Sequence, residues 1–302
     1  MSVVELEARE VALEAPSGLW AEAWQRLRRN PGAIVGFVLV FSFVVVAIFA
    51  PLIAPADPNV QNLRLIREGC CPGPSLDHLF GLDELGRDEL SRVVYGARFS
   101  LLIGVVAVSV GLSLGLVLGA TAGFLGGFVD SVIMRLMDIM LSIPSLLMAV
   151  GIVAMLGPGL FQIMIAIGVV NVPIFARLLR GSILAQREND FVLAARSVGV
   201  PRRSILAAHI IPNAISPVIV QATLAMATAI IDVAGLGFLG LGPQDPATPE
   251  WGTMLTGTVR YLQTAAHLAI IPGVAIVVSV LGFNLIGDGL REALDPKLRG
   301  RT

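Results

Sequence analysis

The chain has 302 residues, of which 55% are hydrophobic and only 14% charged, and its mean hydropathy is +0.82. This composition excludes an ordinary soluble domain and predicts an all-α integral membrane protein. The formal net charge of −1 gives no reason to expect a nucleic-acid partner.

Residues 1–31 precede the first long apolar run. They begin with an acidic stretch, from Glu5 to Glu14, which lacks the basic start of a secretory signal peptide. A short amphipathic helix capped by Ser17 is expected next, with Trp24 at the level of the lipid headgroups. We therefore expect 1–31 to be a cytoplasmic segment that ends in an interfacial helix.

Six apolar segments follow, each close to the roughly 20 residues that a bilayer requires. The predicted membrane spans are 32–52, 100–123, 131–156, 161–179, 214–241 and 268–287.

The distribution of basic residues predicts the orientation of these spans. Basic residues gather at 26–29, 177–203 and 291–301, and all three groups fall on one side if there are six spans. The positive-inside rule makes that side the cytoplasm, so both termini are expected inside and the loop 53–99 outside. The expected parts are a cytoplasmic segment (1–31), a first span with its outer loop (32–99), a transmembrane domain (100–290) that contains a cytoplasmic loop (188–212), and a cytoplasmic tail (291–302).

The loop 188–212 has the pattern of two short helices around a glycine. Asp190 lies where negative charge stabilises a helix N-terminus. Gly199 suits the end of that helix, and Pro201 suits the first turn of the next one. Pro212 is expected to stop the second helix. On charge alone, an ordinary basic loop that obeys the positive-inside rule explains the segment equally well.

The same loop resembles the "EAA" loop of binding-protein-dependent ABC importer permeases, which docks as a coupling helix into the ATPase subunit. The match rests on two alanines, a glycine four residues later, and a downstream isoleucine and proline. It departs from the family at Leu193, where the family has glutamate. The resemblance implies that the residues coupled to the ATPase are Asp190, Ala194, Ala195, Gly199, Pro201, Arg202, Arg203, Ile205 and Pro212.

The segment 80–104 resembles the signature that opens the second span in the oligopeptide, dipeptide and nickel branch of these permeases. Gly86 suits a turn, and Arg87 and Asp88 can pair locally. A structural role and a contact with a ligand or partner both stay open for this signature. The matching positions are Gly81, Asp83, Gly86, Arg87, Asp88, Ser91, Arg92, Gly96, Arg98, Ser100 and Leu101.

Further matches to the family extend the resemblance over residues 75–298. They include Pro249 to Gly252, which matches an outer Trp-Gly element. Because the loop 53–99 and Trp251 are outside elements without a role in the membrane, we expect them to form part of the docking surface for a solute-binding protein.

Cys70 and Cys71 lie in the same outer loop. An oxidising compartment permits disulfides, but adjacent cysteines bridge only with strain. A bond between them, two free thiols and bonds to another chain therefore all stay open. The chain has no other cysteine, so it offers no spacing typical of a metal site.

The second span carries Gly111, Gly115, Gly119 and Gly123, which lie on one helix face and predict close packing against another helix. In the third span, Arg135 and Asp138 are expected to form a local ion pair. Polar residues in spans mostly face protein or water, so some are expected to line a transport path. The candidates for that path are Asn171, Gln221, Thr228 and Asp232.

The sequence contains no Gly-x-x-x-x-Gly-Lys-Ser/Thr phosphate loop. We therefore expect no cofactor in this chain and no enzymatic activity, with ATP and Mg bound by separate ATPase subunits. A stand-alone channel or an intramembrane enzyme is the rival class of function, but neither explains the coupling-loop pattern.

The resemblance implies the type I ABC importer permease fold and a place in a bacterial or archaeal plasma (inner) membrane. It also implies a second, homologous permease, one or two ATPase subunits and an extracytoplasmic solute-binding protein. Small peptides are the expected substrate, with nickel or another small solute as the alternative.

Overall fold

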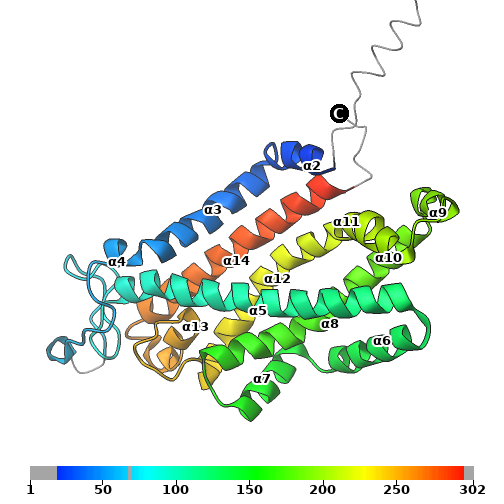
Figure 1. Cartoon of the computed structure of the whole chain (residues 1–302). Coiled ribbons are helices and arrows are strands. Elements are labelled where there is room, and N and C mark those ends of the chain that lie inside the picture. Colours follow the sequence, from blue (N-terminus) through cyan, green and yellow to red (C-terminus); the bar gives the residue numbers. More distant parts are fainter. Residues whose placement is uncertain (1–18, 67–69, 296–302) are drawn as a thin grey trace, which may run out of the picture.

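A computed structural model describes residues 19–66 and 70–295 of the chain (Figure 1). Within those ranges the regular structure is helical, apart from one isolated antiparallel bridge between Leu82 and Asp88. The all-α prediction is thereby confirmed.

The long helices are α3 (Pro31–Ile48), α5 (Glu89–Leu125), α6 (Gly127–Ser142), α7 (Ser145–Leu156), α8 (Leu160–Arg187), α12 (Ser216–Leu236) and α14 (His267–Leu294). The shorter elements are α2 (Leu19–Leu27), α4 (Ala50–Ile53), η1 (Leu63–Leu65), α9 (Asp190–Ser197), α10 (Arg202–Ile205), η2 (Leu206–Ile210), α11 (Ile211–Ala214), η3 (Gly237–Leu241), α13 (Trp251–Met254) and η4 (Thr258–Tyr261). Of these, η2 and η3 are single π-helical segments.

Among the described residues, five helices are long and apolar enough to cross a membrane: α3, α5, α8, α12 with η3, and α14. The pair α6 and α7 makes a sixth candidate, bent by 94° at its break. The six predicted segments are therefore all found, although α5 begins at Glu89 and runs without a break through the expected boundary between 99 and 100.

The third span is two helices rather than the one predicted over 131–156. Ile143 has an extended backbone, with φ −94° and ψ 129°, and it directly precedes Pro144. Because a proline ring disfavours helical backbone in the residue before it, the helix ends there and α7 starts again at Ser145.

The pair expected between Arg135 and Asp138 is wrong. Asp138 is instead bonded to Arg177 of α8, and Arg180 of α8 holds Asp130 of α6 through two bonds of 2.7 and 2.6 Å. Both ion pairs cross between helices, so α6 is held along α8.

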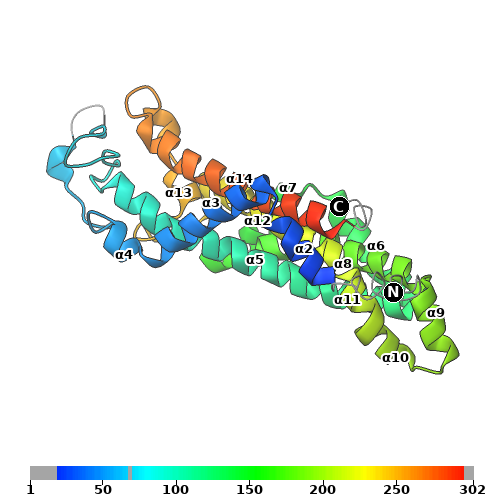
Figure 2. The same ribbon diagram turned by 90° about the horizontal axis from the view of Figure 1, so that it is seen from above.

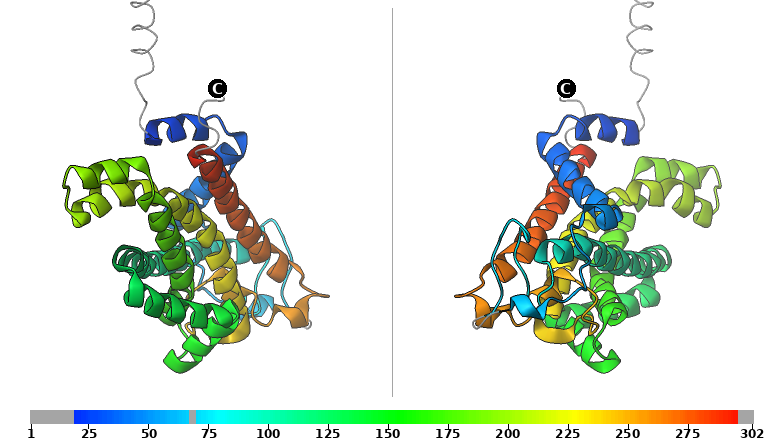
Figure 3. Two further views of the ribbon diagram at one scale, coloured as in Figure 1. Left: turned by 90° about the vertical axis from the view of Figure 1, so that its right-hand side faces the viewer. Right: turned by 90° about the vertical axis from the view of Figure 1, so that its left-hand side faces the viewer.

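The two ends of the molecule differ. The loop between α4 and α5 lies with α13 at one end, while α2, the end of α14 and the helices α9 and α10 lie at the other (Figures 1 and 2). Seen along the helices, α9 and α10 project sideways from the bundle (Figure 3). Helix α2 packs through Ala23 and Leu27 against the last turn of α14, whereas Trp24 is 58% exposed. This arrangement supports the amphipathic helix expected there; its predicted cap, Ser17, lies outside the described residues.

The centre of the fold is the packing of α5 along α8, where the predicted glycine stripe is confirmed. A Cβ atom added to Gly115 would lie 2.5 Å from Phe175 Cβ, and one added to Gly119 would lie 2.5 Å from the carbonyl oxygen of Ala176. No side chain fits at such distances, so the glycines allow the two backbones to approach. Phe175 itself is fully buried in this interface.

We expect Gly115→Ala to destabilise the protein, because the new methyl group must push α5 and α8 apart. Overpacking of this kind typically costs about 1–3 kcal/mol. The matched control is Gly181→Ala in α8, since an added Cβ there would meet nothing within 4 Å. Thermal unfolding of the detergent-solubilised chain should show a lower midpoint for Gly115→Ala alone, and equal midpoints would contradict the packing argument.

Candidate functional site

Residues 190–214 form a small helical unit between the C-terminal end of α8 and the N-terminal end of α12, which we call the knob (Figure 1). Its first helix, α9, starts at Asp190 and ends at Ser197. Gly199 follows with φ +79°, while the amide of Gly199 donates to the Arg196 carbonyl (3.0 Å) and that of Val200 donates to the Ala195 carbonyl (3.1 Å). These bonds make a Schellman cap, so the predicted helix end at Gly199 is confirmed.

The knob has a buried side that attaches it to the spans. Val192, Ile205 and Ile210 are 0–4% exposed and belong to the same apolar cluster as Ile183 of α8. Ala195 packs partly against this cluster. The knob is therefore a packed extension of the bundle.

The remaining predicted coupling residues lie on the outer side of the knob. Asp190, Ala194, Pro201, Arg202, Arg203 and Pro212 are all exposed. Apolar side chains that sequence reasoning did not single out accompany them, because Leu193 is 52% and Val198 is 78% exposed. Exposed apolar groups beside arginines are typical of a surface that a partner covers.

Two details of the second helix differ from the prediction. Pro201 has extended backbone and stands at the N-cap of α10, one residue before its first turn. Pro212 does not end the helical run, because it lies in the first turn of α11, which follows the π-helical η2 and continues to Ala214. Ile215 keeps helical backbone, so the chain passes from α10 to α12 with little interruption.

Three polar residues of α12 share a face. Thr228 and Asp232 follow Gln221 by 7 and 11 residues, so all three lie within one stripe of an α-helix. Gln221 and Asp232 are half-buried and Thr228 is exposed. Asn171 is not part of this stripe, because it is 5% exposed between α8 and α5 and donates to the Ile167 carbonyl at 2.8 Å.

At the opposite end, residues 54–66, 70–88 and 242–266 form what we call the outer cap, after the side of the membrane on which the sequence predicts it. Its centre is Asp83, which accepts from the side chain of Arg87 (2.6 Å) and lies 3.4 Å from that of Arg92. Arg87 also donates to the carbonyl of Pro246 (2.9 Å) and Arg92 to that of Pro58 (3.3 Å). Two largely buried arginines thus tie three distant segments to one carboxylate.

Arg87 thus pairs locally with Asp83 and not with Asp88. Asp88 instead caps α5, since its Oδ2 accepts from the amide (2.8 Å) and the hydroxyl (2.7 Å) of Ser91. This cap explains why α5 starts at Glu89, well before the predicted span. It also gives this part of the signature a structural role.

Trp251 was expected on a docking surface, and this expectation is wrong because its side chain is 0% exposed. Its indole Nε1 donates to the Val93 carbonyl (3.0 Å), and its ring meets Phe43 edge to face at 5.6 Å. A Cβ atom on Gly96 would lie 2.6 Å from the indole ring, so a glycine in α5 makes room for it. Trp251 fastens the outer cap to the spans.

The neighbouring Glu250 is 1% exposed and caps α13. Its carboxylate accepts from the amides of Gly252 and Thr253, both at 2.8 Å, and from the hydroxyl of Ser100 at 3.2 Å. Burial raises the pKa of Glu250 above its ordinary 4.5, and these hydrogen bonds oppose the rise.

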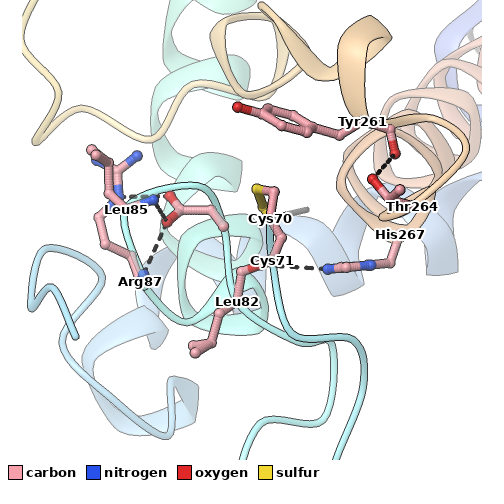
Figure 4. Close-up of a disulfide and its surroundings, with 9 residues drawn as sticks. Cys70, Cys71, Leu82, Leu85, Arg87, Tyr261, Thr264 and His267 are labelled. Carbon is pink, nitrogen blue, oxygen red and sulfur yellow. Dashed lines mark hydrogen bonds and ion pairs between the residues drawn. A yellow bond between two sulfur atoms is a disulfide. The ribbon is translucent and has the colours of Figure 1, made fainter. Parts of the chain in front are cut away.

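Cys70 and Cys71 are joined by a disulfide, which decides among the alternatives left open above. The pair packs against Ala265 and Leu268. Tyr261 belongs to the same apolar cluster and lies beside the disulfide (Figure 4). The disulfide thereby fixes the loop before α5 to the start of α14. Within 19–66 and 70–295, no group of three histidine, cysteine or acidic residues is arranged to hold a metal ion.

Two family descriptions match the chain. The family described as "binding-protein-dependent transport system inner membrane component" matches residues 115–300. The family described as "N-terminal TM domain of oligopeptide transport permease C" matches residues 18–68.

Curated relatives resemble nearly the whole chain. The dipeptide transport system permease protein of Alkalihalophilus pseudofirmus is 49% identical over 283 residues, which cover 93% of this chain and 90% of the relative. The di/tripeptide transport system permease protein of Pseudomonas aeruginosa is 47% identical and covers 97% of this chain and 96% of the relative. The glutathione transport system permease protein of Shigella flexneri is 47% identical, and the match covers 93% of this chain and 91% of the relative.

A solved structure has a related fold. The MetNI methionine ABC transporter in an inward-facing conformation includes a chain with a TM-score of 0.55 and 20% identity. The similarity covers 68% of this chain and 96% of that one. At this identity the comparison bears on the fold alone.

We expect Glu250→Ala to destabilise the outer cap, because it leaves up to three buried donors unpaired at about 1–3 kcal/mol each. Glu250→Gln should lose less, since its amide oxygen still accepts. A raised pKa in the folded state means that the stability contributed by this titration is present below pH 4.5 and is lost as pH rises through the raised value.

Thermal unfolding in detergent over a range of pH measures both effects. The variant Glu250→Gln should show a weaker loss of stability with rising pH than the wild-type chain. An identical pH dependence in both proteins would mean that Glu250 does not titrate in this way.

Proposed function

The chain belongs to the family of binding-protein-dependent transport system inner membrane components, and from that premise we propose that it is the permease subunit of an ATP-driven importer of small peptides. The observation that carries this proposal is the knob, a packed unit with an exposed apolar and basic outer side. An ATPase subunit that binds the knob can move the spans to which it is packed.

The connections of the knob support a route for that movement. On one side the knob continues from α8, and on the other it passes through η2 and α11 into α12. Since α8 is packed closely on α5, a displacement of the knob moves both spans together and also shifts the polar stripe of α12. Rigid-body motion of this kind is a known means of alternating access.

The polar stripe of α12 supports a role as part of the transport path. Gln221, Thr228 and Asp232 are not fully covered by this chain, and polar groups facing lipid are costly. A second, homologous permease placed against α12 would enclose the stripe in a water-filled path. Asn171 lies away from this stripe and supports the α5–α8 interface instead.

The relatives favour peptides as substrates, because their names refer to dipeptides, tripeptides and glutathione. We further propose that ATP and Mg are bound by separate ATPase subunits and that an extracytoplasmic solute-binding protein delivers the peptide. In the outer cap, Val60, Leu63 and Leu76 are 61–98% exposed and offer an apolar docking surface for that protein. We propose these exposed residues as the docking surface instead of Trp251, which is buried.

The knob is tested by Gly199→Val beside Gly199→Asn. A Cβ at Gly199 meets nothing within 4 Å, so the penalty comes from its backbone, where φ is +79°. Valine resists this conformation by about 1–2 kcal/mol, whereas asparagine tolerates it. We also expect Ala194→Arg to block docking, because Ala194 is exposed beside Leu193.

The measurement is ATP hydrolysis by the reconstituted importer with its binding protein and either a dipeptide or a nickel chelate. The dipeptide should stimulate wild type and Gly199→Asn, while Gly199→Val and Ala194→Arg should lose most of the stimulation. Full stimulation of ATP hydrolysis in both damaging variants would refute the coupling role. Stimulation of the wild type by the nickel chelate and not by the dipeptide would refute peptides as the substrate.

The orientation can be tested separately in intact cells. Cys70 and Cys71 are joined to each other, so an added cysteine is the reactive thiol among the described residues. A membrane-impermeant thiol reagent should label Leu76→Cys in the outer cap but not Val198→Cys in the knob, although both positions are highly exposed. The reverse pattern would invert the proposed orientation.

A further inference from the structure

Three arginines surround a pocket between the knob and the inner ends of two spans. The pocket has a volume of about 160 Å³ and is lined by Arg187, Arg196 and Arg202. Its other walls are Gly123 and Phe124 at the end of α5, Ile183 of α8, and Ile205, Leu206 and Ile210 of the knob. The pocket is therefore basic at its rim and apolar at its base.

The three arginines form no ion pair at contact distance within the described parts of the chain. None of the ion pairs formed there includes Arg187, Arg196 or Arg202. Arg187 donates through Nη1 to the Gly123 carbonyl at 3.0 Å, which fixes its guanidinium at the pocket and leaves its other N–H groups for a ligand. Like charges gathered without a counterion repel one another, and an anion bound between them removes that cost.

We propose that this pocket binds the phosphate headgroup of an anionic phospholipid from the cytoplasmic leaflet. The inference rests on the orientation given above, which places the pocket inside the cell. Arginine forks match phosphate oxygens well, and basic pockets at the cytoplasmic ends of membrane helices suit anionic headgroups.

The position of the pocket favours a lipid over a carboxylate of the ATPase subunit. Gly123 is the last residue of the predicted span 100–123, and its carbonyl accepts from Arg187, so the pocket lies at the predicted inner boundary of that span, where headgroups are found. Its apolar base, with Phe124 and Ile183, suits the glycerol and first methylenes below a phosphate. A protein that approaches from the cytoplasm meets the exposed outer side of the knob first. That side includes Arg202, whereas Arg187 is half-buried and bonded to Gly123 at the end of α5.

Such a lipid would connect parts that move together during transport. Its phosphate would bridge the end of α8, helix α9 and helix α10, one arginine from each. The bound lipid would therefore stiffen the junction between knob and spans, and coupling to the ATPase should increase with the anionic lipid content of the membrane.

Native mass spectrometry of the full chain in detergent, with phosphatidylglycerol or phosphatidylcholine added, tests lipid binding without any partner. The variant carries Arg187→Gln and Arg196→Gln. The control carries Arg29→Gln and Arg291→Gln, which remove two exposed arginines from the same end of the molecule. Arg187 and Arg196 line the pocket, whereas Arg29 and Arg291 do not. At about a fivefold gain in affinity for each arginine that contacts the bound headgroup, the variant should lose about 25-fold in phosphatidylglycerol binding.

The control should bind phosphatidylglycerol like the wild type, and phosphatidylcholine should bind weakly to all three proteins. Equal binding to variant and control would overturn the proposal. Displacement of the lipid by an equal concentration of soluble glycerol phosphate would show that the site takes free phosphate and would also overturn it.

A second arm uses the reconstituted importer in nanodiscs of either lipid. If the double variant lowers ATPase assembly equally in both lipids while lipid binding stays normal, the arginines hold an ATPase carboxylate and the proposal fails. Because lipid binding is measured on the isolated chain, its failure is distinguishable from failure of the proposed transport function.

Discussion

The close approach of α5 and α8 is the constraint on which the rest of the structure depends. Glycines at every fourth position of α5 leave no room for a side chain against Phe175 and Ala176 of α8. In a membrane, where apolar burial does not drive helices together, such backbone proximity gains van der Waals contact that larger residues cannot offer. The two helices are therefore one body, and α6 is held to that body by ion pairs from α8.

The two ends of this body carry different chemistry. At the outer end, Asp83 and Glu250 are buried acceptors that fasten the cap through charge-assisted or backbone bonds. At the inner end, the Schellman cap at Gly199 and the buried Val192 and Ile205 hold the knob in a fixed pose. A fixed knob on a fixed helix pair would give a rigid connection between any partner bound at the knob and the polar stripe of α12.

Local signals in the sequence predicted local structure well. The apolar runs predicted the six segments, and the spacing of glycines predicted the face of α5 that packs on α8. Gly199 predicted the C-terminal end of α9. Each of these features depends on neighbouring residues alone. Long-range pairing was not predictable in the same way. Asp83 holds Arg87 and Arg92, whose side chains donate to the carbonyls of Pro246 and Pro58. Trp251 packs on a distant helix, where Gly96 leaves room for its ring. Neither partner has a signal near it in the chain. The break before Pro144 had such a signal, but the apolar run around it favoured one continuous span.

The central claim is that the knob moves with α5 and α8 as one unit. Spin labels at Val117 of α5 and Val198 of the knob, which are 64% and 78% exposed, report on it directly through double electron–electron resonance in the assembled importer. The account predicts that this distance is the same with and without ATP, while the distance from Val198 to the knob of the second permease shortens when ATP binds. If ATP changes the distance between Val117 and Val198 as much as it changes the distance between the two knobs, the claim is contradicted.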